Sequence, residues 1–295
     1  MVDNQQPPND EKRKNDDEQV EWSFDFANLG ASFNRLMDSL AGEEDLKISE
    51  YEIDKASTET ARIKVQFSVG KGSLSAVAED SYNLFEATIR HVGQLEYEID
   101  GEREKQITLR QQTKVEPNLA PVRQGLRALA NRDDLSWDVK VARDVPLSLD
   151  VDAGIGPITL DLNHTTLRNL DVDGGVGKLD IHLPQQPNKL NAEIDGGVGQ
   201  VNVSVPENAD MVLNIDGGVG GIDLTIAPGT ALQIRAEGGI GSINVPDDLQ
   251  RMTRRDLLDA GGVWQSEGFD LAERTVVVRY DGGVGALNVR YGTTV

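Results

Sequence analysis

The chain has 295 residues, no cysteine and a formal net charge of −21 at pH 7. This acidic balance argues against binding to nucleic acid or to anionic lipid, both of which attract basic proteins. The absence of cysteine excludes disulfides and thiolate metal sites. No stretch reaches the roughly 20 apolar residues of a membrane-spanning helix, and the N-terminus lacks the apolar core of a secretory signal. We therefore expect a cytoplasmic protein, or one held at the membrane periphery by a partner.

The N-terminal region divides into two parts. Residues 1–21 are charged and polar, which predicts a disordered acidic tail. Residues 22–45 predict a short amphipathic helix, because their apolar side chains fall three or four positions apart on one helical face. These side chains are Phe26, Leu29, Phe33, Leu36, Met37 and Leu40. Such a face packs on the main domain or pairs with a partner protein; membrane binding is disfavoured because the helix has one Arg and no Lys.

From residue 50 onward, apolar and polar residues alternate with the period of a β-strand. Ile63, Val65 and Phe67 are one example of this alternation. The pattern predicts an all-β domain over residues 50–295, of which 50–136 is a divergent N-terminal part of the same β-structure.

The second half of the chain repeats the phrase Asp-Gly-Gly-Val-Gly at nearly regular intervals. The first five copies are 21 or 22 residues apart, and the sixth follows after 44, about two periods. The acids of the six copies are Asp152, Asp173, Asp195, Asp216, Glu237 and Asp281. A fixed period of this length is typical of solenoids. Residues 137–295 therefore predict a single-stranded β-helix (β-solenoid) with coils of about 21 residues, each made of two strands joined by a glycine corner.

Three expectations concern the corners themselves. Glycine allows a tight bend and lets successive corners stack without side-chain collisions. The apolar residue between the glycines, such as Val176 or Val198, is expected to point inward and plug the corner. The corner acids are expected to form a ladder of like charges about 5 Å apart.

Residues 246–273 interrupt the repeat. Leu249, Met252 and Leu257 predict a short helix that ends at Gly261–Gly262. We interpret this insertion as a cap, because the exposed edges of a solenoid need covering. A binding element is the alternative, since the insertion carries a basic cluster of Arg251, Arg254 and Arg255.

The glycine phrases do not match known ligand loops. In calcium-binding β-rolls an acid occupies the sixth position, whereas here Asp180 falls one residue late and faces away from the turn. Phosphate-binding loops need a following helix, and each phrase here precedes a strand. The histidines His91, His164 and His182 show no metal-ligand spacing. We predict no cofactor, no metal site and no catalytic residue, so the protein is predicted not to be an enzyme.

One outward-facing row of polar residues is the strongest candidate interaction face. Its members follow the corner at matched positions and carry carboxylate or amide groups. They are Asp161, Asp180, Asn202, Asp223, Asn244 and Asn288.

The segments 62–89 and 144–162, together with the closing repeat VVVRYDGGVGALNVR, resemble a known group of bacterial domains. They are similar to the LiaF-like C-terminal domain of the cell-wall-active antibiotics response family and to toast-rack and adhesin-type β-solenoid domains. The resemblance covers residues 55–292. It implies a β-solenoid fold, a link to envelope-stress sensing and attachment to membrane-spanning segments, which this sequence lacks.

Taken together, these features predict a non-enzymatic bacterial β-solenoid that binds or scaffolds a protein partner, or self-associates, in the cell-envelope stress response. The edge strand of the last coil and the 26–41 helix are its expected contact surfaces. An adhesin-like or polysaccharide-binding module that uses the Asp/Asn face is the second hypothesis. A carbohydrate-active β-helix enzyme is the third.

Overall fold

The computed structural model describes residues 46–112, 134–252 and 261–293. These residues form strands and one short 3-10 helix, which confirms the all-β prediction; the predicted tail 1–21 and amphipathic helix 22–45 lie outside them. The elements are β1 (Lys47–Asp54), β2 (Thr60–Gln66), β3 (Lys71–Ala76), β4 (Asn83–His91), β5 (Gln94–Asp100), β6 (Glu104–Gln112), β7 (Ser136–Val141), β8 (Leu147–Asp152), β9 (Ile158–Asp161), β10 (Leu167–Asp173), β11 (Val176–His182), β12 (Leu190–Asp195), β13 (Val198–Val205), β14 (Met211–Asp216), β15 (Val219–Ile226), β16 (Leu232–Asn244), β17 (Gln250–Arg251), β18 (Gly262–Gln265), η1 (Phe269–Leu271) and β19 (Val276–Tyr291).

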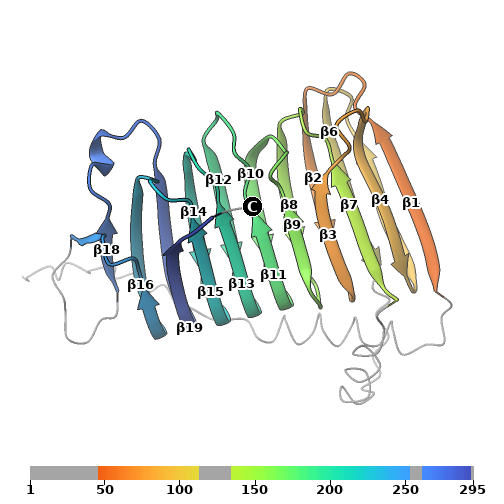
Figure 1. Ribbon diagram of the computed structural model, residues 1–295. Helices are drawn as coiled ribbons and strands as arrows, with labels where there is room; N and C mark the ends of the chain where they lie inside the picture. The colour runs from red at the N-terminus through yellow and green to blue at the C-terminus, as the bar shows by residue number, and fades with distance from the viewer. Residues whose placement is uncertain (1–45, 113–133, 253–260, 294–295) are drawn as a thin grey trace, which may run out of the picture.

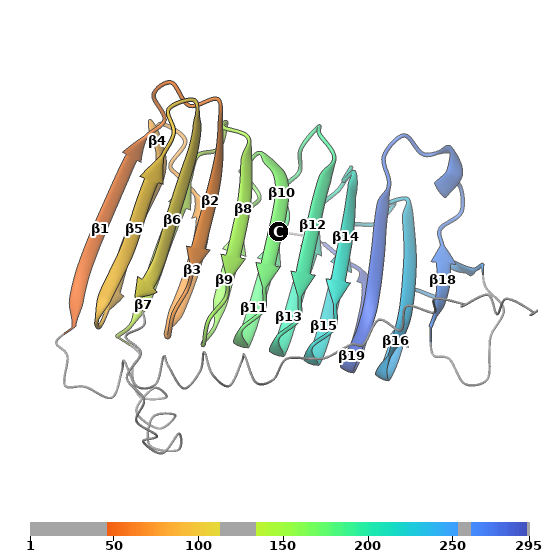
Figure 2. The same ribbon diagram turned by 180° about the vertical axis from the view of Figure 1, so that it is seen from behind.

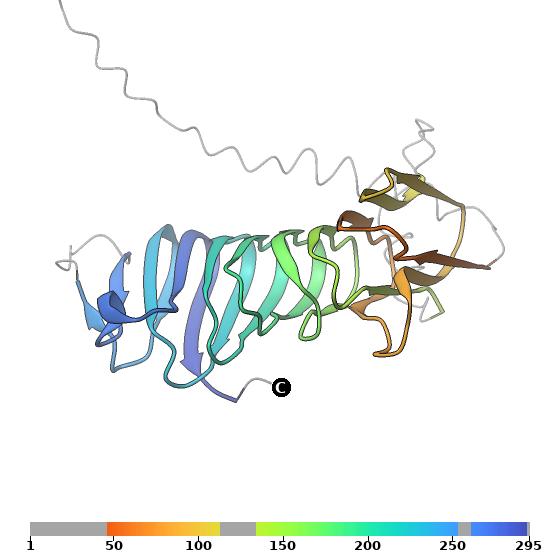
Figure 3. The same ribbon diagram turned by 90° about the horizontal axis from the view of Figure 1, so that it is seen from above.

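The strands form two sheets that face each other across the core (Figures 1, 2 and 3). In the first sheet the spatial order is β5-β6-β2-β8-β10-β12-β14-β19-β16-β18-β17. In the second sheet it is β1-β4-β7-β3-β9-β11-β13-β15-β19-β16. The long strands β16 and β19 pass through a corner and belong to both sheets.

Each repeat supplies one strand to each sheet, and equivalent strands of successive repeats pair in parallel. Leu170 of β10, for example, lies between Leu149 of β8 and Ala192 of β12. All three side chains point into the space between the sheets and are at most 2% exposed. Because strand side chains alternate between faces, the period-two pattern of each repeat builds one continuous core.

The spatial order of the coils departs from their order in the sequence. The last repeat, β19, lies between β14 or β15 and β16, so the repeat before it forms the end of the stack. This order explains the gap of 44 residues. After β15 the chain leaves the adjacent coil position empty and forms β16 to β18 one position further along the stack. It then returns, and β19 occupies the adjacent position. The edge strand predicted for the last coil belongs instead to β16.

The N-terminal end is built in the same way. The first coil, β2 and β3, lies inside the stack and pairs with β8 and β9 on one side and with β6 and β7 on the other. Antiparallel strands β1, β4 and β5 extend the two sheets at this end. Tyr51 and Tyr97, whose ring centroids are 4.3 Å apart, pack against the core there.

The insertion near the C-terminus differs from the predicted helix where the structure describes it. Instead of starting a helix after Leu249, the chain forms β17, which pairs with β18, and β18 pairs antiparallel with the first half of β16. Arg251 lies over the Trp264 ring at 5.0 Å. The strand pairing covers the first-sheet edge of the end coil, which favours the cap interpretation; Leu257, Arg254 and Arg255 lie outside the described residues.

Candidate functional site

The glycine corners join the two sheets along one edge of the stack. Asp152 and Asp195 each accept a hydrogen bond from the backbone N–H two residues later, at 3.0 and 3.1 Å. This contact closes the turn in the way that Asp and Asn side chains commonly do. The acid of the repeated phrase therefore has a local structural function that the repeat spacing does not reveal.

In four of the later corners the apolar residue is exposed, which contradicts the predicted inward plug. Val176 and Val219 are each 37% exposed, Val284 is 50% exposed and Ile240 is 76% exposed. The first coil differs, because Val69 is only 6% exposed. The chain turns so tightly at the glycines that the residue between them lies on the outside of the bend.

The corner acids form the predicted ladder. In the paired strands they are aligned in the order Asp152, Asp173, Asp195, Asp216, Asp281 and Glu237, which we call the corner-acid row. Burial raises the pKa of Asp173, and the carboxylates of Asp152, Asp171, Asp195 and Asp150 raise it further. Burial, followed by repulsion from the neighbouring acids of the row, also raises the pKa of Asp216.

These pKa shifts predict that mild acid stabilises the fold. Between the ordinary Asp pKa of 3.8 and the raised value, the folded chain binds more protons than the unfolded chain, so the free energy of unfolding increases as pH falls. We expect a higher melting temperature at pH 5 than at pH 7. Asp173→Asn should increase the free energy of unfolding at pH 7 by about 0.5–1 kcal/mol and weaken this pH dependence. Calorimetric melts at both pH values measure this. Asp247→Asn is the control, because Asp247 lies on an exposed turn. If it raises the melting temperature as much as Asp173→Asn does, the change in net charge alone explains the result.

The Asp/Asn face is partly assembled as predicted. Register places Asp180, Asn202, Asp223, Asn288 and Asn244 side by side on the second sheet, and we call these five the Asp/Asn row. Asp161 does not belong to it, because Asp161 pairs with His182 and Thr159 pairs with Asp180. Strand β9 is in register with the later repeats, but Asp161 is the ninth residue after its corner acid, whereas Asp180 is the seventh after Asp173; the matched residue of β9 is therefore Thr159.

Members of the Asp/Asn row bond to one another. Asn202 donates to Asp180, Asn288 donates to Asp223 and Asn244 donates to Asn288, each at 2.7 Å. Although burial has the opposite effect, hydrogen bonds from Lys178 and Asn202 hold the pKa of Asp180 below its ordinary value. The alternation of amide and carboxylate thus stabilises the stack along its length. A binding function for this face stays a prediction.

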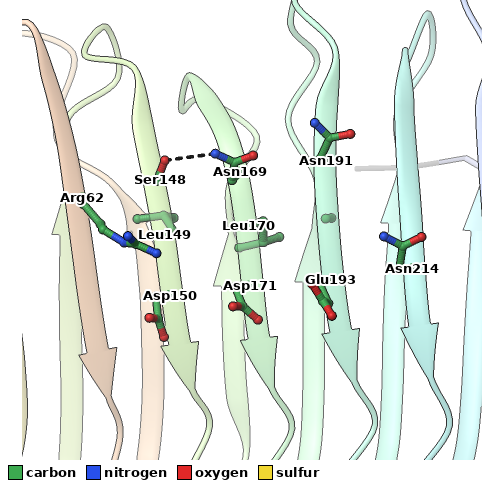
Figure 4. Close-up of a pocket in the computed structure, with 11 residues that line it drawn as sticks. Arg62, Ser148, Leu149, Asp150, Asn169, Leu170, Asp171, Asn191, Glu193 and Asn214 are labelled. Carbon is green, nitrogen blue, oxygen red and sulfur yellow. Dashed lines mark hydrogen bonds between the residues drawn. The ribbon is translucent and has the colours of Figure 1, made fainter. Parts of the chain in front are cut away.

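A polar groove crosses the outer face of the first sheet (Figure 4). Its cavity volume is about 330 Å³, and strands β2, β8, β10, β12 and β14 line it. Side chains of two aligned rows point into it. One row is Ser148, Asn169 and Asn191, and the other is Asp150, Asp171, Glu193 and Asn214. We call this feature the first-sheet groove.

The charges of the first-sheet groove are unevenly compensated. Lys64 pairs with Asp150 at 3.0 Å, and Asn169 donates to Ser148 at 3.3 Å. Asp171 and Glu193 are exposed and lie at neighbouring positions of β10 and β12. The middle of the groove is therefore acidic, whereas Lys64 lies at one end of the same row and Arg279 at the other.

Sequence reasoning missed this groove although the signal was present. The residues two places before each corner acid are outward-facing, and Asp150, Asp171 and Glu193 share that position in three consecutive repeats. The pattern of polar residues after each corner predicted the Asp/Asn row instead. Alignment of the residues before the corner would have identified the groove.

The described residues contain no assembled metal site. Among them, no group of three or more His, Cys, Asp or Glu side chains could hold a metal ion. His91 is buried on β4, where Ser49 lies 2.9 Å from its Nε2 atom, and burial lowers its pKa. His182 lies on β11, and His164 in the turn after β9. Within the same residues, no helix is long and apolar enough to cross a membrane.

Comparison with known proteins finds one family model and solved structures that are similar to this chain. The family model for the N-terminal domain of toast_rack, DUF2154, matches residues 41–204, more than half of the chain. No curated protein matches. A solved structure of a "putative cell adhesion protein" from Clostridium sporogenes is 16% identical and has a TM-score of 0.53, with 84% of this chain and 100% of that chain covered. A solved structure of a "putative adhesin" from Bacteroides fragilis is 13% identical and has a TM-score of 0.40. The match covers 83% of this chain and 97% of that chain. The chain therefore belongs to the family defined by the N-terminal domain of toast_rack.

Proposed function

We propose that this protein is a non-enzymatic binding scaffold that holds a partner in the first-sheet groove. Membership of the toast-rack family supports a module that binds rather than catalyses. The observation that carries the proposal is the acidic middle of the groove, where Asp171 and Glu193 lie side by side on β10 and β12. Among the residues of the groove wall the basic side chain is Arg62 of β2, which lies two strands away from Asp171, opposite Ser148 of β8. Carboxylates at this spacing favour a partner that presents Lys or Arg side chains.

The rigid stack suits this function. Each groove-lining strand is fixed by parallel neighbours on both sides, so the acids occupy defined positions before a partner arrives. Preorganised groups lose little conformational entropy on binding. We propose the bacterial cell-envelope stress response as the biological context, as the resemblance to LiaF-like domains implies, with the protein recruited from the cytoplasm to the membrane periphery by its partner.

A titration with a cationic peptide tests the groove. We expect deca-lysine to bind the full chain and the double variant Asp171→Asn/Glu193→Gln to bind it about tenfold more weakly. Glu207→Gln/Asp247→Asn is the matched control, because it removes the same charge from exposed positions outside the groove. Isothermal titration calorimetry measures both. Equal weakening by the two variants would mean that net charge, rather than the groove, attracts the peptide.

Polysaccharide binding in the same groove is the second candidate function. The amides of Asn169, Asn191 and Asn214 offer donors and acceptors for sugar hydroxyls, and the name of the Clostridium relative suggests adhesion. This function predicts binding on a glycan array that Asn169→Ala/Asn191→Ala abolishes and Asp171→Asn leaves intact. An array without any bound glycan contradicts it.

A further inference from the structure

An apolar ridge follows the corner edge of the stack. Aligned residues of successive coils form it, and we call it the corner ridge: Val176, Val198, Val219, Val284 and Ile240. Four of the ten exposed large hydrophobic side chains in the described part of the chain lie in this row. At the interstrand spacing of about 4.8 Å, the ridge is about 19 Å long.

The corner ridge has no cover from its own coils. The residues on both sides of each ridge residue are glycines, such as Gly175 and Gly177 beside Val176, and they have no side chain to shield it. A continuous apolar strip of this kind on a chain with net charge −21 indicates a contact surface rather than scattered exposure.

Charge disfavours a second copy of the chain as the occupant. The corner-acid row runs parallel to the ridge, three residues earlier in each coil, so two facing ridges would bring two rows of carboxylates together. The segment 26–40 of this chain is different: it contains one Arg and one Asp, and therefore has no net charge. Its apolar face can cover the ridge without that repulsion.

The chain enters the structure at the correct edge. Lys47 at the start of β1 pairs with His91, and the adjacent Arg90 pairs with Ser136, where β7 begins. Strand β7 starts beside Lys71, immediately after the first corner. The start of β1 thus lies at the same edge of the second sheet as the corners (Figure 1).

The extended connection ends just short of the first ridge residue. Five interstrand steps, β1 to β4, β7, β3, β9 and β11, separate the start of β1 from the first ridge residue, Val176, a distance of about 24 Å. The six residues that separate Leu40 from Leu46 span about 20 Å when extended. Leu40 can therefore lie between Ile155 and Val176 at the beginning of the ridge.

The lengths then match along the whole ridge. A helix rises about 1.5 Å per residue, so its apolar face extends about 21 Å from Leu40 to Phe26. Its turns repeat every 5.4 Å or so, close to the spacing of the ridge residues. With Leu40 just short of Val176, the helix places Leu29 near Val284 and Phe26 near Ile240.

We propose that residues 26–40 form a helix that lies along the corner ridge of the same chain, with Leu40 at the Val176 end and Phe26 at the Ile240 end. A short tether makes this contact intramolecular and raises the effective concentration of the helix. This contact is independent of the first-sheet groove, and its test does not depend on the proposed function.

A single engineered disulfide tests the placement, because the chain has no other cysteine. We expect Leu29→Cys/Val284→Cys to form an intramolecular disulfide in most molecules under mild oxidation, seen as a mobility shift on a non-reducing gel and confirmed by peptide mass. The matched control is Leu29→Cys/Val277→Cys, because Val277 lies on the same strand but on the outer face of the first sheet. Disulfide-linked dimers in place of the intramolecular bond, or equal linkage in both pairs, would overturn the proposal.

Hydrogen exchange tests the same contact without a cross-link. Amides of residues 26–40 should exchange at least tenfold more slowly in the full chain than in the variant Val284→Asp/Ile240→Asp. Both substituted side chains are half or more exposed, so the stack itself should keep its protection. Val277→Asp is the control and should leave the exchange of residues 26–40 unchanged. Unprotected amides in the wild-type chain contradict the proposal.

Discussion

Replacing Gly218 with alanine is expected to destabilise the protein by about 3–5 kcal/mol. A Cβ atom at this position would lie 1.8 Å from the Gly197 carbonyl oxygen and 2.7 Å from the Gly197 nitrogen. Both atoms belong to the backbone of the preceding corner, which the parallel strands hold in place. The collision can be relieved only by separating two coils, so the hydrogen bonds beside the corner would be lost as well.

Thermal unfolding measures this effect, and Gly221→Ala provides a control three residues away. A Cβ atom at Gly221 meets only the end of the Gln200 side chain, which can move aside. The aligned position in the neighbouring coil is already an alanine, Ala286. We expect a melting temperature lower by about 10 °C for Gly218→Ala and little change for Gly221→Ala. Similar melting temperatures for both variants would show that close stacking of the corners does not require glycine.

The sequence was sufficient to predict the repeat and the inward faces of its strands. Leu179 and Ile181 are buried as predicted, and the outward position of Asp180 between them follows from the same alternation. These features depend on strand periodicity, which is a local property. The stacking of corner glycines also followed from the period, since residues at equivalent positions of parallel coils must lie side by side.

The order of the coils could not be predicted, because it depends on a choice between equivalent partners. Strand β16 and strand β19 each carry the repeat pattern, and both could pair with β14 and β15. Only the three-dimensional arrangement shows that β19 occupies the inner position. The outward direction of the Val176 side chain was also not predicted. The alternation of side chains between the two faces of a strand does not continue through a bend at glycines with positive φ, such as Gly177 with a φ of 144°.

Replacing Gln186 with alanine is expected to destabilise the protein by about 2–4 kcal/mol, an effect that no repeat pattern indicates. Pairing of β10 with β12 begins only at Asn169, so Leu167 has no strand beside it on that side. The buried side chain of Gln186 fills this place. Its Oε1 atom accepts from the Leu167 N–H at 2.8 Å, and its Nε2 atom donates to the Leu167 carbonyl at 2.7 Å. One amide thus satisfies both backbone groups that a strand would have paired.

Removing that amide leaves a donor and an acceptor buried without partners, and each unsatisfied group costs about 1–3 kcal/mol. Gln185→Ala is the matched control, because the neighbouring Gln185 is exposed and should tolerate the change. Chemical denaturation of the two variants gives the comparison. Gln186→Glu adds a further test: a carboxylate can accept from the Leu167 N–H but cannot donate to its carbonyl, so this variant should be less stable than the wild type at pH 7. Wild-type stability in Gln186→Ala would show that water replaces the amide and that the coil does not depend on this side chain.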